Sequence, residues 1–522
     1  MTNAKFVAIA AWLLLGSTAL ADDNFANVDQ DGSGNALSVT QGPGDDNDLG
    51  SETLAARQFG DSNILTVLQS GSGNAIGALP SGLLQSSNRN SATITQSSDG
   101  NSVGQVTQTG IVSATGGTAL RRNILTIVQE ADDGNVVGTV TQTRSSGAAS
   151  AAANSATITQ HGKSNDLLLL SQSGYAEQAT ITQTGDDNAI AALEQIGARN
   201  VATINLTGDR NGTSPFGLVA GLNGAWGGLT QGRIYQNNDF WGAGLADANT
   251  LTFTVDGNDN DFGFSQTGVD NTIDGLISVG GNNNQTGVEQ LGVSNLATFT
   301  VDGDDNSVFV RQGLWPVNVG NAATILVSGD RNALGVIQSG TGNAAVANID
   351  GDDNLLNISQ ESLLLGNLAD VAVTGDDNAV ALTQSGGLNS GKVAITGNDN
   401  RLDVSQTGLS NSLDIKIWGN RNNNAGAFSG IAFDMASLTS PNLVPGSIVQ
   451  NGSGNSITYN VGLQGDPNSN DNRFAFSQLG NDNTITGTTI GSNNQVVIVQ
   501  NGSSNITSFY QNGFGNIIGV SQ

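Results

Sequence analysis

The sequence contains no cysteine, one histidine and only 17 lysine and arginine residues in 522 positions. The lack of cysteine excludes disulfides, thiolate zinc sites and thiol nucleophiles. The shortage of basic residues argues against a nucleic-acid partner, because phosphates are bound by clusters of lysine and arginine. Aromatic residues at 5% and hydrophobic residues at 37% are few for one large close-packed core. These absences favour a polar, repetitive protein.

The formal net charge is −28, although only 12% of the residues are charged. The imbalance therefore reflects few basic residues more than many acidic ones. Glycine is abundant, with 71 residues against 7 prolines, but it lacks the every-third-residue spacing of collagen. We expect a neutral-polar surface with scattered carboxylates.

Residues 1–21 have the pattern of a secretory signal peptide. Lys5 precedes an apolar run over 6–15, and Ala19-Leu20-Ala21 supplies a small-residue cleavage site. We expect cleavage before Asp22 and export of the mature chain. No later run approaches the roughly 20 apolar residues that a membrane-spanning helix needs.

The rest of the chain is dominated by an internal repeat in which Gln follows Asn by six residues. Asn63, Gln69 and Asn74 show the spacing, and Asn321, Asn332, Asn343 and Asn354 follow one another at steps of eleven. The residue six after each Asn alternates between Gln and an aliphatic residue in this stretch. The repeating unit is therefore 22 residues long and consists of two unlike halves.

Each half reads as one short strand and one turn. In the segment 400–406, Asn400, Leu402, Val404 and Gln406 share one face, whereas the charged residues lie on the other. Glycine-rich tetrads such as 375–378 supply residues that tolerate tight turns. We predict an all-β fold, a parallel β-solenoid or cross-β stack of about 22-residue strand-turn-strand-turn coils.

Interruptions of the repeat divide the chain without implying separate globular domains. We predict repeat arrays over 22–211, 249–423 and 451–522, separated by insertion loops over 212–248 and 424–450.

In-register stacking would place Asn on Asn and Gln on Gln, so that each inward amide donates to one neighbouring coil and accepts from the other. We predict that these amide ladders hold the coils together and drive assembly. The residues chosen as ladder members are Asn63, Gln69, Asn332, Gln338, Asn378, Gln384, Asn400, Gln406, Asn494, Gln500, Asn505, Gln511, Asn516 and Gln522.

The repeat fits both ends of the sequence, at 24–30 and at 516–522. Solenoids that stay monomeric carry atypical capping repeats, and neither end shows an obvious one. We therefore expect the protein to polymerise with itself, head to tail. The alternative is a monomeric acidic β-solenoid that acts as an adhesin and binds calcium or glycans.

Paired carboxylates recur in the turn tetrad Gly-Asp-Asp-Asn. Stacking would bring Asp352 and Asp353 close to Asp376 and Asp377, and calcium would relieve their repulsion. Calcium is the only cofactor considered, and a solvated acidic turn is the competing interpretation. His161 has no evident catalytic partner, and we predict that the protein is not an enzyme.

The Asn-x5-Gln-x4-Asn-x5-Gln pattern, as in 494–511, resembles the curlin repeat of bacterial curli. This resemblance implies a secreted functional amyloid on the surface of a Gram-negative cell, forming adhesive fimbria-like or pilus-like fibres in biofilms. It also implies other curli-like subunits and an outer-membrane secretion pore as partners. This chain is several times longer than a typical curli subunit.

Overall fold

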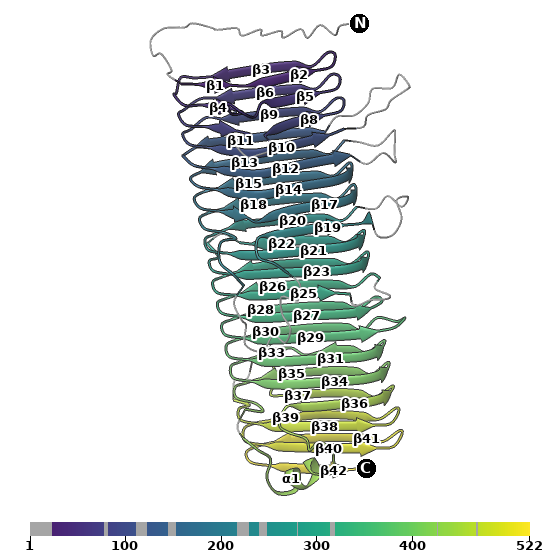
Figure 1. Cartoon of the computed structure of the whole chain (residues 1–522). Helices are drawn as coiled ribbons and strands as arrows, with labels where there is room; N and C mark the ends of the chain where they lie inside the picture. The colour runs from purple at the N-terminus through teal and green to yellow at the C-terminus, as the bar shows by residue number, and fades with distance from the viewer. Residues whose placement is uncertain are drawn as a thin grey trace.

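The computed structural model describes residues 23–77, 82–110, 123–144, 153–216, 229–239, 248–278, 280–313, 319–424, 426–465 and 468–522. The chain winds into a rod of stacked coils, each contributing to two parallel sheets on opposite sides of a narrow core (Figure 1). The expected β-solenoid is therefore confirmed. The expected signal peptide lies outside the described residues.

Sheet A carries the half-repeats in which Gln is retained throughout. Its strands are β1 (Phe25–Ala26), β2 (Val28–Asp31), β4 (Asp48–Leu49), β5 (Ala56–Phe59), β7 (Ala75–Ile76), β8 (Leu83–Ser86), β10 (Ser102–Thr109), β12 (Val136–Arg144), β14 (Asp166–Tyr175), β16 (Ala189–Ile190), β17 (Ala192–Ala198), β19 (Arg233–Asn237), β21 (Asp261–Val269), β23 (Gln285–Val293), β25 (Ser307–Gln312), β27 (Ala333–Gly340), β29 (Leu355–Ser362), β31 (Ala379–Gly387), β34 (Arg401–Leu409), β36 (Ser447–Ser453), β38 (Arg473–Leu479), β40 (Gln495–Asn501) and β42 (Ile517–Ser521).

Sheet B carries the other half-repeats. Its strands are β3 (Ala36–Gln41), β6 (Ile64–Gln69), β9 (Ser91–Gln96), β11 (Ile124–Ala131), β13 (Ser155–Gly162), β15 (Gln178–Thr184), β18 (Val201–Thr207), β20 (Thr250–Asp256), β22 (Thr272–Ile277), β24 (Leu296–Asp302), β26 (Ala322–Ser328), β28 (Ala344–Asp350), β30 (Leu368–Thr374), β32 (Ser390–Lys392), β33 (Ile395–Thr396), β35 (Ser412–Trp418), β37 (Ser456–Val461), β39 (Thr484–Ile490) and β41 (Ile506–Asn512).

Adjacent coils pair in parallel and in register. Gln338 of β27 stands opposite Gln360 of β29, which stands opposite Gln384 of β31. The same repeat position therefore stacks along the rod. A single coil has too little apolar surface to be stable alone, and each coil depends on its neighbours.

The alternation of side chains between core and surface follows the expected parity. Leu334 and Val336 of β27 are buried against the aliphatic residues of sheet B in one continuous core. Most charged residues point outward, with Glu177 and Asp261 among the exceptions, and some form pairs between neighbouring coils, as in Lys392–Asp370 at 3.4 Å and Arg311–Glu289 at 3.0 Å. The core therefore contains amides and aliphatic groups and few charges.

The turns leading into sheet A have a recurrent backbone geometry. Gly351 has φ +139°, and Asp353, directly before Asn354, has φ +58°. A Cβ atom at Gly351 would overlap the carbonyl of Gly375 in the next coil. Glycine is thus required here by the close approach of two coils and by the positive φ.

Two strands fall within spans that were expected to be insertion loops. β19 lies inside 212–248 and pairs with β17 and β21, whereas β36 begins inside 424–450. The interruptions are therefore shorter than the missing repeat suggested.

One short helix, α1 (Gly430–Ala436), also falls within 424–450. It packs on the outer face of sheet A, where Ala432 and Ala436 contact a cluster containing Ala475 and Val497. Among the described residues, no helix is long and apolar enough to cross a membrane.

Candidate functional site

A continuous ladder of glutamine side chains runs along the inner face of sheet A. In each link the Nε2 of one residue donates to the Oε1 of the glutamine in the next coil. The ladder consists of Gln30, Gln58, Gln85, Gln108, Gln142, Gln172, Gln195, Gln236, Gln266, Gln290, Gln312, Gln338, Gln360, Gln384, Gln406, Gln450, Gln478, Gln500 and Gln522.

Gln338 shows how one ladder member is satisfied. Its Nε2 donates to Gln360 Oε1 at 2.8 Å and to the Ala322 carbonyl at 2.8 Å, while its Oε1 accepts from Gln312 Nε2 at 2.9 Å. The side chain is fully buried. An unpaired buried amide group costs roughly 1–3 kcal/mol, and the glutamines of the neighbouring coils remove this cost by supplying a donor and an acceptor.

Sheet B has a glutamine ladder only in its first coils. It links Gln41, Gln69, Gln96, Gln129, Gln160 and Gln183. From Leu206 to Val461 the same position is aliphatic, as in Val327 and Ile349, and the last two coils have Thr489 and Gln511 there. The aliphatic residues belong to the hydrophobic core, so this half of the later coils is held by aliphatic packing.

Asparagine forms a row at the entrance to each sheet. The Asn332 side chain donates from Nδ2 to Asn306 Oδ1 at 3.1 Å and to the Gly351 carbonyl at 2.7 Å, and its backbone N–H also donates to Asn306 Oδ1, at 2.9 Å. Donation therefore runs toward the N-terminus, opposite to the glutamine ladder.

In the row at the entrance to sheet A, each asparagine donates to the Oδ1 of the asparagine in the preceding coil. In four links only the backbone N–H donates, namely those from Asn47, Asn101, Asn306 and Asn516. The row contains Asn24, Asn47, Asn74, Asn101, Asn135, Asn165, Asn188, Asn211, Asn260, Asn284, Asn306, Asn332, Asn354, Asn378, Asn400, Asn422, Asn472, Asn494 and Asn516.

The structure distributes the predicted ladder residues over these rows. Asn63, Gln69, Asn505 and Gln511 belong to sheet B. The remaining ones belong to sheet A: Asn332, Gln338, Asn378, Gln384, Asn400, Gln406, Asn494, Gln500, Asn516 and Gln522. Gln511 stands apart, because its Oε1 accepts from Thr489 Oγ1 at 3.2 Å in the preceding coil.

A buried glutamate replaces asparagine in one coil of the row entering sheet B. Glu177 stands six residues before Gln183, so its position in the repeat was readable from the sequence. Its Oε2 accepts from the Asn200 N–H at 2.8 Å, whereas its Oε1 is buried without a partner. Burial raises the pKa of Glu177 to about 8, and the bond from Asn200 opposes this rise. The carboxyl is therefore mostly protonated at neutral pH.

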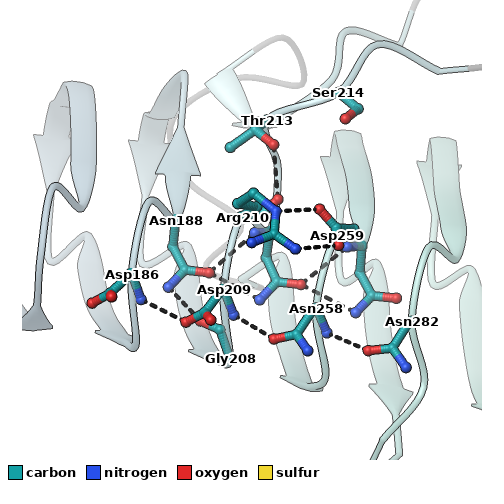
Figure 2. A network of polar contacts seen from close by, with 12 residues as sticks. Asp186, Asn188, Gly208, Asp209, Arg210, Thr213, Ser214, Asn258, Asp259 and Asn282 are labelled. Carbon is teal, nitrogen blue, oxygen red and sulfur yellow. Dashed lines mark hydrogen bonds and ion pairs between the residues drawn. The ribbon is translucent and has the colours of Figure 1, made fainter.

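A further ladder runs along the turns that lead from sheet B to sheet A, and sequence reasoning missed it. The backbone N–H of Asp186 donates to Asp209 Oδ1 at 2.8 Å, that of Asp209 to Asn258 Oδ1 at 2.7 Å, and that of Asn258 to Asn282 Oδ1 at 2.9 Å (Figure 2). The sequence signal for this ladder was the recurrence of Asp or Asn two residues before each asparagine of the row that enters sheet A.

The four aspartates considered for calcium belong to this edge. Asp352 Oδ1 accepts from the Asp330 N–H at 2.8 Å, and Asp376 Oδ1 accepts from the Asp352 N–H at 3.0 Å. Asp353 forms two hydrogen bonds with Arg331, at 2.8 and 2.7 Å, and these lower the pKa of Asp353. Asp377 occupies the same turn position in the next coil. In the described ranges no group of three or more acidic, histidine or cysteine residues could hold a metal ion.

The same arginine–aspartate fork recurs elsewhere on this edge. Arg210 donates to both carboxylate oxygens of Asp259 at 2.7 Å (Figure 2), and Arg421 does so with Asp471 at 2.8 Å. The only histidine, His161, lies in β13 and faces Glu130 of the preceding coil at 3.7 Å, with both side chains about half exposed. These pairs link neighbouring coils at the surface.

Comparison with protein families gives a match over part of the chain. The model described as curlin associated repeat matches residues 281–313, 329–361 and 375–408. These three segments contain the regular coils around β23 to β34, in which the amide ladders are continuous. A comparison with curated proteins found none that matches.

Proposed function

We propose that this chain, three segments of which match the curlin associated repeat, is a secreted structural protein whose copies stack into extracellular curli-type amyloid fibres. Such fibres would serve cell adhesion and biofilm cohesion on a Gram-negative cell. The family and the β-solenoid are structural rather than catalytic in character. The observation that carries the proposal is the continuity of the amide ladders from one described coil to the next.

The interface between coils within one chain is also suited to join two chains. In sheet A every glutamine link repeats the same donor, the same acceptor and the same strand register, so a coil of a second copy meets the same chemistry there as the next coil of the first. Gln30 and Gln522 lie in one column, and Asn24 and Asn516 lie in another. Contact between these coils would continue both rows with the same direction of donation.

The test is assembly of the purified mature chain. We expect fibres in electron micrographs, a rise in thioflavin fluorescence, and a fibre reflection near 4.8 Å from the spacing of strands. Replacement of both Gln30 and Gln522 by Leu should slow fibre growth, because each joint would lose its glutamine link. The matched control is Gln178→Leu, since Gln178 points outward from β15.

A chain that stays monomeric by light scattering at high concentration and gives no such reflection would refute assembly. In that event, binding of calcium or glycans to the monomer would support the alternative of a non-polymerising adhesin.

Export rests on residues 1–21, and secretion through an outer-membrane pore together with other curli-like subunits belongs to the same proposal. Mass spectrometry of protein recovered from the culture medium should give a mature chain beginning at Asp22. Retention of residues 1–21 on extracellular protein would contradict this processing.

A further inference from the structure

The two edges of the rod differ in chemistry. The turns from sheet B to sheet A form an acidic edge whose aspartates, over residues 303–399, are Asp304, Asp305, Asp330, Asp352, Asp353, Asp376, Asp377 and Asp399. On the opposite edge, where the chain passes from sheet A to sheet B, none of the turns that the structure describes between 292 and 455 contains a charged residue, although the exposed Glu361 stands near the end of β29, two residues before Leu363. Within this stretch, charge in the turns is thus concentrated on one edge, whereas elsewhere the turns from sheet A to sheet B include Asp61, Asp270 and Asp482.

The uncharged edge carries a ridge of exposed leucines, which we call the leucine ridge: Leu363, Leu364, Leu365, Leu388 and Leu409. Leu363 and Leu364 are 84% and 83% exposed, and the other three are about half exposed. The turn containing Leu363 and Leu364 projects beyond its neighbours on the right-hand side of Figure 1. Single exposed leucines are ordinary, but a contiguous group of them marks an interaction surface.

The ridge is contiguous over three coils. The Leu388 N–H donates to the Gly366 carbonyl at 3.1 Å, directly after the first three leucines. Leu409 stands opposite Gly387 in the strand register, and a Cβ at Gly387 would lie within 3.5 Å of both Leu365 and Leu409 side chains. Because Gly387 has no side chain, Leu365 and Leu409 of the two flanking coils can approach one another across the middle coil.

We propose that the leucine ridge is the lateral contact between two copies of this chain, so that rods associate edge to edge in pairs. A second copy fits this surface because the ridge is uncharged and can face its own image across a twofold axis. The acidic edge cannot serve, since it would place rows of carboxylates against one another or against apolar side chains. The inference rests on the proposed function only where it concerns fibres, because it predicts that each fibre consists of paired rods.

The negative charge of the chain determines how this contact depends on salt. Two chains with a formal charge of −28 each repel one another, and salt screens that repulsion over a Debye length of about 8 Å at physiological ionic strength. Lateral pairing should therefore strengthen as salt increases, whereas a contact made by salt bridges would weaken.

The test combines two measurements on the full mature chain. The variant carries Leu363→Ser, Leu364→Ser and Leu388→Ser. The control carries Leu168→Ser and Leu326→Ser, which remove two leucines that are 54% and 45% exposed on the sheet faces. Sedimentation velocity before fibre growth should show salt-dependent dimers of the wild-type and control proteins, and a dissociation constant at least about tenfold higher for the variant.

Electron microscopy of fibres separates this inference from the proposed function. The wild-type and control proteins should form paired rods, and the variant single rods that grow equally fast. Wild-type fibres made only of single rods, without soluble dimers, would overturn lateral pairing and leave fibre assembly intact. Soluble dimers that depend on the ridge, in a protein that never forms fibres, would support pairing and refute assembly.

Discussion

Replacement of Glu177 by glutamine is expected to stabilise the coils around β15 in a pH-dependent manner. Glu177 is fully buried, its Oε1 has no partner, and burial raises its pKa from 4.5 to about 8. Since the folded state holds this proton more tightly than the unfolded state, stability from Glu177 is fully present below pH 4.5 and is lost as the pH rises to about 8.

The size of the effect follows from the pKa difference. One pH unit corresponds to about 1.4 kcal/mol. Between pH 4.5 and 8 Glu177 ionises in the opened state but keeps its proton in the folded state, so the free energy of opening falls by about 5 kcal/mol over this range. About 3 kcal/mol of this is already lost at pH 7. The amide side chain introduced by Glu177→Gln has the same shape, carries no charge and can still accept from the Asn200 N–H, so this loss should disappear.

Hydrogen exchange is the appropriate assay, because a stack of coils opens locally as well as globally. Opening free energies of the amides in β15, corrected for the pH dependence of intrinsic exchange, should fall by several kcal/mol from pH 5 to pH 8 in the wild-type protein and stay nearly level in Glu177→Gln. The control Glu130→Gln removes an exposed carboxylate two coils away. Parallel curves for the wild-type protein and Glu177→Gln would refute the reasoning.

Two other predictions concern the ladder and the acidic edge. Gln338→Leu should lower the free energy of local opening by roughly 1–3 kcal/mol, because Gln360 Oε1 loses its donor while Gln312 Nε2 keeps the Leu296 and Asn321 carbonyls. The control Ile349→Leu, a volume-conserving change at an aliphatic position of sheet B, should cost less than about 1.5 kcal/mol; equal costs would contradict the ladder argument. Calcium should leave the melting temperature unchanged, because Asp352, Asp353 and Asp376 already accept hydrogen bonds; a saturable rise abolished by Asp352→Asn with Asp376→Asn would show that calcium displaces these bonds.

The fold was predictable from the sequence because its physics is periodic. Inward residues at even offsets from each Asn must be neutral, and residues at odd offsets can be charged, so the pattern of Asn400 to Gln406 contained the orientation of every side chain in that strand. The register followed from the need to place Gln on Gln. The 22-residue unit with one half lacking Gln corresponds to the later coils, where sheet A keeps its ladder and sheet B has Val327 and Ile349.

The turn ladder, β19 and the helix α1 could not be predicted, because they depend on contacts that the repeat spacing does not specify. The turn aspartates were expected to repel one another, but Asp352 and Asp376 each accept a backbone N–H of the preceding coil, in turns that share a positive φ directly before Asn. β19 went unrecognised because it lies between interruptions of the repeat. The helix α1 covers part of the outer face of sheet A, which was expected to be exposed. The apolar residues Val497 and Val499 stand at outward positions and could have indicated that this face is covered.

The opposite directions of donation in the asparagine and glutamine rows have an electrical consequence. In the sheet-A half of every coil the Gln amide points its nitrogen toward the C-terminus and the Asn amide its oxygen, so the dipoles of these two rows largely cancel. In sheet B the glutamine row ends at Gln183, while the asparagine row continues to Asn505. The later coils thus keep an uncancelled column of amide dipoles whose negative end faces the C-terminus, which makes the rod electrically distinguishable from its reverse.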